Sequence, residues 1–81
     1  MRHKSGYAIE VDIITTDNLY TSGVFIINPD GLATQRITID QTIYRTNQEA
    51  IEASKVMGKV LLSRHLSGQE PLYFEYVWSQ E

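Results

Sequence analysis

A single stretch of helical spacing divides this chain, and the other apolar segments follow the two-residue period of β-strands. The stretch opens with Thr46-Asn47-Gln48-Glu49, a capping box in which the Thr46 hydroxyl accepts a hydrogen bond from the Glu49 amide. We expect a helix from Thr46 to about Leu66, with Gly68 and Pro71 marking its end. Its core-facing stripe comprises Ala50, Ala53, Met57, Val60 and Leu61.

Three strand-like segments precede the helix. In the first, residues 7–15, Ile9, Val11 and Ile13 should face the core, while Glu10 and Asp12 face solvent. The second, residues 20–28, is apolar on both faces from Val24 to Ile27, so both faces need a cover. A turn at residues 28–31 leads to the third, residues 33–40, whose core residues are Ile37 and Ile39.

The tail alternates again after the helix. Leu72, Phe74, Tyr76 and Trp78 share one side if the segment is extended. A terminal tail this rich in aromatic residues should be ordered, as a fourth strand or as an arm docked on a partner. We favour an arm that crosses to a second copy of the chain, over one that pairs within its own sheet.

These elements predict an α+β protein of order β-β-β-α-β: an antiparallel sheet of three or four strands with one amphipathic helix on one face. The 81 residues make a single domain, with a disordered start at residues 1–6 and the C-terminal strand or docking arm at residues 69–81.

The charge and the cysteine content narrow the setting. With no cysteine, disulfides and thiolate metal sites are excluded, and the basic start is followed by no apolar segment that would make a signal peptide. We expect a cytoplasmic protein that does not bind membranes. The net charge of −3 disfavours a nucleic-acid module, although Lys55 and Lys59, one helical turn apart, could contact phosphates.

Catalytic residues are not evident. His3 and His65 lack partners at a useful spacing, and Ser63 points to a different side of the helix from His65. Glu10 and Asp12 could bind a hard cation, but a solvated strand face balanced by Arg36 explains them better. We therefore expect no enzyme activity, no cofactor and no metal site.

Two of the glycines stand inside regular elements. Gly23 lies in the second strand, where it indicates a bulge or a close approach. Gly58 lies in mid-helix, where glycine lowers helix stability by about 1 kcal/mol relative to alanine. That cost indicates close packing at Gly58, against the sheet or against another chain.

Two motifs carry a family resemblance: Tyr7-Ala8-Ile9-Glu10-Val11 and Thr46-Asn47-Gln48-Glu49-Ala50-Ile51-Glu52-Ala53. Residues 7–66 resemble small bacterial β-β-β-α modules of unknown function, relatives of the haemolysin-type transcriptional activator, and the double-stranded-RNA-binding-like fold without its first helix. The resemblance implies a small regulatory or accessory protein, and it transfers no catalytic residue.

Surplus apolar surface suggests the function. One helix can cover one face of three strands, so a chain this small should need a partner for the rest. We expect a non-enzymatic protein-interaction or regulatory module, a homodimer. The alternatives are a nucleic-acid-associated transcriptional regulator and a phage- or plasmid-type inhibitor of a host protein. The expected interface comprises Phe25, Ile26, Ile51, Leu62, Leu66, Leu72, Phe74, Tyr76 and Trp78.

Overall fold

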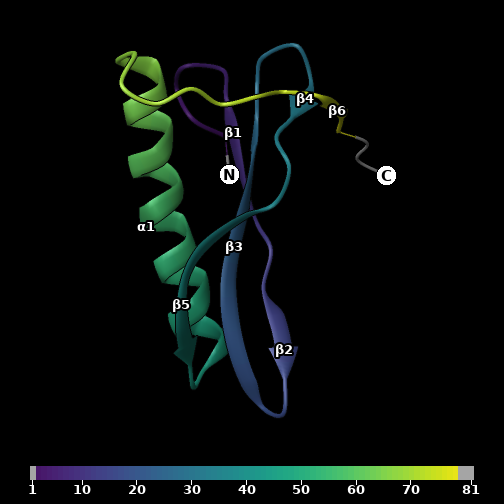
Figure 1. Ribbon diagram of the computed structural model, residues 1–81, viewed down its shortest axis with the longest axis vertical. Coiled ribbons are helices and arrows are strands. Elements are labelled where there is room, and N and C mark those ends of the chain that lie inside the picture. The colour runs from purple at the N-terminus through teal and green to yellow at the C-terminus, as the bar shows by residue number, and fades with distance from the viewer. Residues whose placement is uncertain (1, 79–81) are drawn as a thin grey trace.

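The computed structural model describes residues 2–78, apart from the side chains of residues 40–42, and has an antiparallel sheet with one helix packed on it (Figure 1). The central strand is β3 (Leu19–Ile27). The other elements are β1 (Ala8–Val11), β2 (Ile14–Thr16), β4 (Leu32–Ala33), β5 (Ile37–Tyr44), α1 (Asn47–Leu66) and β6 (Tyr76–Val77). The predicted α+β class and the order of strands around the helix are confirmed.

Two strands pair with each long side of β3. β1 and β2 pair with β3 on one side, and β4 and β5 pair with it on the other; β6 pairs with β4 and ends the sheet. We expected residues 7–15 and residues 33–40 to be continuous strands, and each is interrupted, at residues 12–13 and 34–36. All these pairings are antiparallel.

The interruptions face one another across Gly23. The register between β3 and β5 shifts between Thr21 and Gly23, as the glycine indicated. The Arg36 guanidinium lies directly over Gly23, where a Cβ would occupy its space. Arg36 Nε donates to Asp12 Oδ2 at 2.6 Å, and Nη2 donates to the Asp12 carbonyl at 2.9 Å. The predicted balance of Asp12 by Arg36 is confirmed.

The turn at residues 28–31 forms as its composition predicts. The Asn28 side chain accepts hydrogen bonds from the amides of Asp30 at 3.0 Å and Leu32 at 2.9 Å. Gly31 takes a φ of +86°, which a residue with a Cβ rarely adopts. This turn joins β3 to β4 and brings Ala33 opposite Ile27.

The helix begins and ends at the predicted residues. Thr46 is the N-cap, and its hydroxyl accepts a hydrogen bond from the Glu49 amide at 3.1 Å. The helix ends at Leu66, and Gly68 reverses the chain with a φ of +79°. The Gly68 and Gln69 amides donate to the carbonyls of the last helical turn.

The helix packs on β3, β1 and β5 through a different stripe from the one we expected. Its buried residues are Ala50, Ser54, Gly58 and Leu62, while Ala53, Met57, Val60 and Leu61 are only partly buried. Three of the four buried residues are small, so the helix axis can lie close to the sheet. A Cβ on Gly58 would lie 2.7 Å from Ile9 Cγ2, which explains the glycine.

The core centres on Ile9, Val24, Ile26 and Leu62. Ile37, Ile39 and Leu61 pack against this cluster while partly buried, and Val11 and Ile13 are also only partly buried. Of the residues predicted to face the core, Ile9 and Ala50 are fully buried. The predicted orientation of the first strand holds, because Ile9 faces the helix.

Two buried hydroxyls join the helix to the sheet. Ser22 Oγ, from β3, and Ser54 Oγ, from α1, both donate to the Ala50 carbonyl, at 3.1 and 2.8 Å. Both serines have no exposed surface. Each hydroxyl is satisfied, so the small stripe gains a specific contact without leaving a buried polar group unpaired.

Residues 2–6, part of the start that we expected to be disordered, are described in the structure. The His3 amide donates to the Tyr7 carbonyl at 2.7 Å, and Arg2 forms a bridge with Ala8. Gly6 supplies the positive φ that this reversal needs. The N-terminal residues therefore fold back on β1. Met1 lies outside the described residues.

Candidate interaction surface

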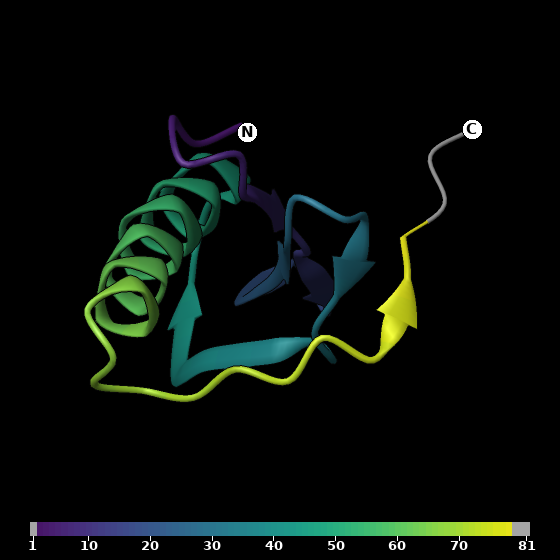
Figure 2. The ribbon, with the colours of Figure 1, turned by 90° about the horizontal axis from the view of Figure 1, so that it is seen from above.

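Residues 69–78, which we call the arm, run from the end of α1 across the sheet to β6 (Figures 1 and 2). β6 pairs with β4, Ala33 lying opposite Tyr76 and Leu32 opposite Val77. The Glu75 amide donates to the Ala33 carbonyl at 3.1 Å, and the Trp78 amide to the Gly31 carbonyl at 2.9 Å. The arm is thus ordered, as we predicted, and it joins its own sheet, which was the less favoured alternative.

An aromatic cluster fixes the first half of the arm to the helix end. The Phe74 ring lies 5.8 Å from the Tyr7 ring and 5.5 Å from the His65 ring, and Tyr7 meets His65 edge-on at 5.9 Å. His65 Nδ1 also lies 3.1 Å from the Glu70 carbonyl, to which a proton on that nitrogen can donate. His65 therefore holds the arm in place.

Trp78 fixes the other end of the arm, on the opposite face of the sheet. Its ring centroid lies 5.1 Å from that of Phe25, which faces away from α1. The indole N–H is buried, with no hydrogen-bond partner among the described residues. Trp78 supplies part of the cover that an apolar second strand requires on its outer face.

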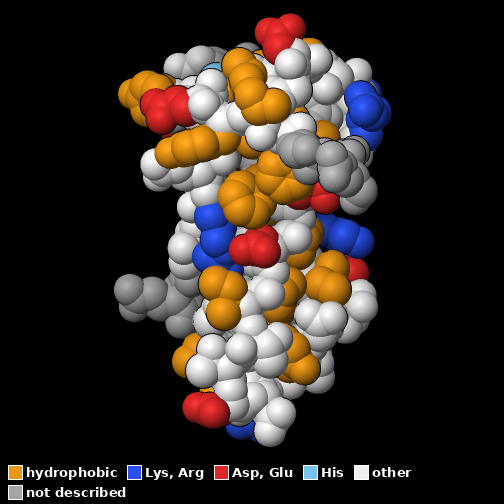
Figure 3. Space-filling view, turned by 90° about the vertical axis from the view of Figure 1, so that its right-hand side faces the viewer, with side chains coloured by type: hydrophobic (Ala, Val, Ile, Leu, Met, Phe, Trp, Pro, Cys, Tyr) orange, Lys and Arg blue, Asp and Glu red, His pale blue; other side chains and the backbone are white. Residues whose placement is uncertain are grey.

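Four large apolar side chains are exposed at the end of α1 and along the arm. We call Leu66, Tyr73, Tyr76 and Val77 the arm surface; Val77 is 81% exposed, Tyr73 70% and Leu66 48%. The four make up half of the large apolar side chains that are exposed among the described residues. Figure 3, which views the face opposite α1, shows hydrophobic side chains gathered at the height of β4 and β6.

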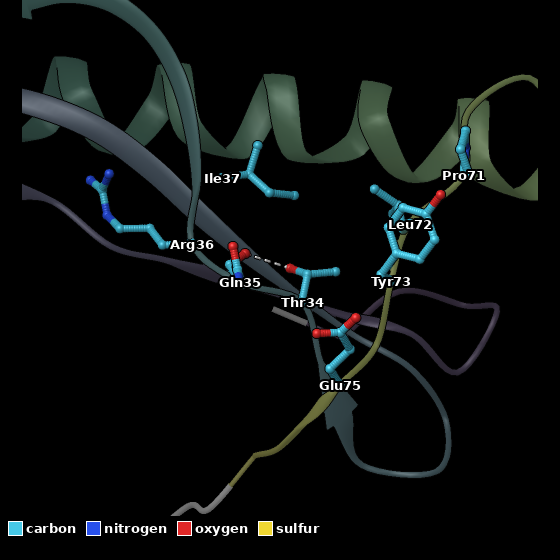
Figure 4. A pocket seen from close by; sticks show the side chains of 8 residues that line it. All are labelled: Thr34, Gln35, Arg36, Ile37, Pro71, Leu72, Tyr73 and Glu75. Atoms are coloured by element: carbon cyan, nitrogen blue, oxygen red, sulfur yellow. Dashed lines mark hydrogen bonds between the residues drawn. The ribbon is translucent and has the colours of Figure 1, made fainter.

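Two grooves lie along successive parts of the arm, and both are lined by Thr34 and Gln35. One, of about 320 Å³, lies between residues 34–37 and residues 71–75; Tyr73 and Glu75 border it on the arm, and Thr34 and Ile37 on the other side (Figure 4). Another of about 320 Å³ is lined by Phe25, Ala33, Thr34, Gln35, Tyr76, Val77 and Trp78. Gln35 Nε2 donates to the Tyr76 hydroxyl at 2.9 Å between the two. Shallow grooves thus lie beside the arm.

The structure separates the predicted interface residues into two groups. Ile26 and Leu62 are fully buried in this chain's own core, so their expected place on an interface is wrong. Ile51, Phe25, Leu72, Phe74 and Trp78 are partly buried, and Leu66 and Tyr76 are exposed. Sequence reasoning missed Tyr73 and Val77, because strict alternation assigned them to the other side of the tail.

The predicted alternation holds for burial except at Tyr76, which is exposed. The arm is nevertheless not one strand, because residues 71–75 have no regular structure and only Tyr76 and Val77 form β6. Leu72 and Phe74 pack on the core cluster, and Trp78 contacts Phe25 on the outer face.

A further groove, of about 440 Å³, lies between β1 and the first half of α1. It is lined by Ile9, Glu10, Val11, Ile13, Asn47, Ile51 and Lys55. Lys55 is thus partly buried against the sheet, and Lys59, one turn on, is exposed. The two predicted phosphate contacts therefore lie in different surroundings.

The described residues contain no group of three or more His, Cys, Asp or Glu side chains arranged to hold a metal ion. Nor does the described part of the chain include a helix with the length and apolar character needed to cross a membrane. Comparison with models of known protein families, with curated proteins and with solved structures found no match.

Proposed function

We propose that this chain is a non-enzymatic protein-interaction module, in a cytoplasmic setting, that acts as a homodimer through the arm surface. The observation that carries the proposal is the concentration of exposed apolar side chains within residues 66–77. Single exposed apolar residues are normal on a protein surface, whereas several within one short segment favour a contact site there.

The charges of the chain permit a second copy as the partner. Each copy carries a net charge of −3, so two copies repel one another weakly. The four residues of the arm surface are uncharged, and Glu75 is the one exposed carboxylate among residues 71–78. Charges elsewhere on the two copies are screened beyond about 10 Å.

A charge on the arm surface tests the proposal. Tyr73→Glu places a carboxylate on the most exposed aromatic residue of the arm surface, and we expect the dimer dissociation constant to rise at least tenfold, measured by light scattering over a dilution series. The matched control is Val56→Glu, which adds the same charge at an exposed apolar residue of α1, outside the arm surface.

The control should retain the wild-type dissociation constant. Equal weakening by the two variants would show that added negative charge, and not the arm surface, decides association. A dimer that neither variant weakens would place the contact elsewhere on the molecule.

A further inference from the structure

We propose that the two copies exchange their arms, so that residues 71–78 of one copy occupy the place of the same residues on the other. This inference rests on the proposed homodimer and adds how it is built. In the exchanged dimer, Phe74 would contact Tyr7 and His65 of the partner, and β6 would pair with the partner's β4. The place of the arm is thus a binding site whose occupant is the arm of either copy.

The arm is joined to the rest of the chain at one end through a short exposed hinge. Ser67, Gly68, Gln69 and Pro71 are exposed, and Glu70 is partly buried. Gly68 reverses the chain with a φ of +79°, and glycine can leave that conformation at little cost. Pro71 prevents the helix from continuing and favours an extended Glu70, so an opened hinge would carry the arm away from its own body.

The contacts of the arm beyond the hinge can all be formed between two chains. They are the ring contacts of Phe74 and Trp78, the pairing of β6 with β4, and the hydrogen bond from Gln35 to Tyr76. Exchange preserves each of them with identical geometry, because the partner presents the same body. Its cost is therefore confined to the hinge and to the entropy of association.

Exposed apolar residues on either side of the hinge supply a favourable free energy for exchange. Leu66 precedes the hinge and Tyr73 follows it, and both are large, apolar and exposed in the closed chain. In an exchanged dimer each hinge leads from one copy to the other, so the exposed Leu66 and Tyr73 that flank it lie where the partner's surface can cover them. Burial of these side chains is a gain that the closed monomer lacks.

A disulfide between β4 and β6 distinguishes exchange from surface docking. Leu32 and Val77 are opposite partners, and opposite residues of an antiparallel pair lie about 4.5–5.5 Å apart at Cα, within the range a disulfide spans. The chain has no cysteine, so the double variant Leu32→Cys/Val77→Cys contains one designed pair. After refolding and oxidation at a concentration that populates the dimer, we expect at least half of the chains to run as covalent dimers on a non-reducing gel.

A mixture of the single variants Leu32→Cys and Val77→Cys, unfolded and refolded together, is the second test. Exchange should form a disulfide between the Leu32→Cys chain and the Val77→Cys chain, which mass spectrometry of the linked peptides identifies. The variant Val56→Cys places an exposed cysteine outside the arm, so it shows how much disulfide forms by random collision. We expect its yield of disulfide-linked dimers to be several-fold lower than that of the mixture.

Two failures can be told apart. Intramolecular disulfides alone, in a sample whose native molar mass is that of a dimer, would overturn arm exchange and leave the proposed homodimer standing. Intramolecular disulfides in a sample whose wild type is monomeric would overturn both.

Discussion

At the scale of single residues, glycine decides how closely α1 approaches the sheet. We expect Gly58→Ala to destabilise the fold by up to about 2 kcal/mol: overpacking against Ile9 costs about 1–3 kcal/mol, and the better helix propensity of alanine returns about 1 kcal/mol. Chemical denaturation measures the change. The control is Ser63→Ala on the exposed side of the helix, where we expect a change within about 0.5 kcal/mol.

Gly23 admits the Arg36 guanidinium, which bonds Asp12. Gly23→Ala should displace the Arg36 side chain and lower the free energy of unfolding by about 1 kcal/mol. The loss should be no larger, because the ion pair between Arg36 and Asp12 is partly exposed and contributes little more than that. In an Arg36→Ala background the same change should be neutral or stabilising, because alanine is better than glycine within a strand. A double-mutant cycle measures the coupling; a cost that is equal in both backgrounds would contradict this account.

How well the sequence predicts the role of a residue depends on how close in the sequence its partners lie. The Thr46 cap and the Asn28 turn depend on side chains within four residues of one another, so the sequence predicts them well. The buried face of α1 depends on a distant strand. Ser54 looks polar in isolation, but it is buried because its hydroxyl bonds the Ala50 carbonyl within the helix.

At the scale of elements, the side of the arm that carries Phe74 contributes to the stability of the fold, whereas the side that carries Tyr73 contributes little. We expect Phe74→Ala to cost about 2 kcal/mol, less than the roughly 3–5 kcal/mol of a fully buried phenylalanine because Phe74 is partly exposed. Tyr73→Ala, one residue away on the outward side, should change stability by no more than about 0.5 kcal/mol at concentrations where the chain is monomeric. Thermal or urea unfolding measures both, and equal costs would show that the arm does not distinguish its two sides.

The arm also marks where sequence reasoning reached its limit. Its aromatic content predicts order correctly, since a segment with so much apolar area gains by burying it. Its partner could not be predicted, because β4 is two residues long and becomes a free edge only where residues 34–36 leave the sheet. At that departure Thr34 Oγ1 accepts a hydrogen bond from the Ile26 amide and Arg36 reaches across Gly23 to Asp12, which are contacts between residues apart in the sequence.

At the scale of the whole molecule, the sheet has two apolar sides and one helix. The helix covers the side of Ile9, Val24 and Ile26, and Trp78 covers Phe25 on the other. Half of the large apolar side chains that are exposed among the described residues belong to the arm surface. The order of the elements follows from local periodicity, whereas the division of two predicted strands into shorter ones depends on contacts made only in the folded chain.

The molar mass of the wild-type chain in solution tests the homodimer most directly. Light scattering over a concentration series should show the mass rising from 9.3 kDa toward about twice that value, as a dimerisation equilibrium requires. A mass that stays at 9.3 kDa up to millimolar concentration would contradict the account, because the arm surface would then remain in water with no second copy to cover it.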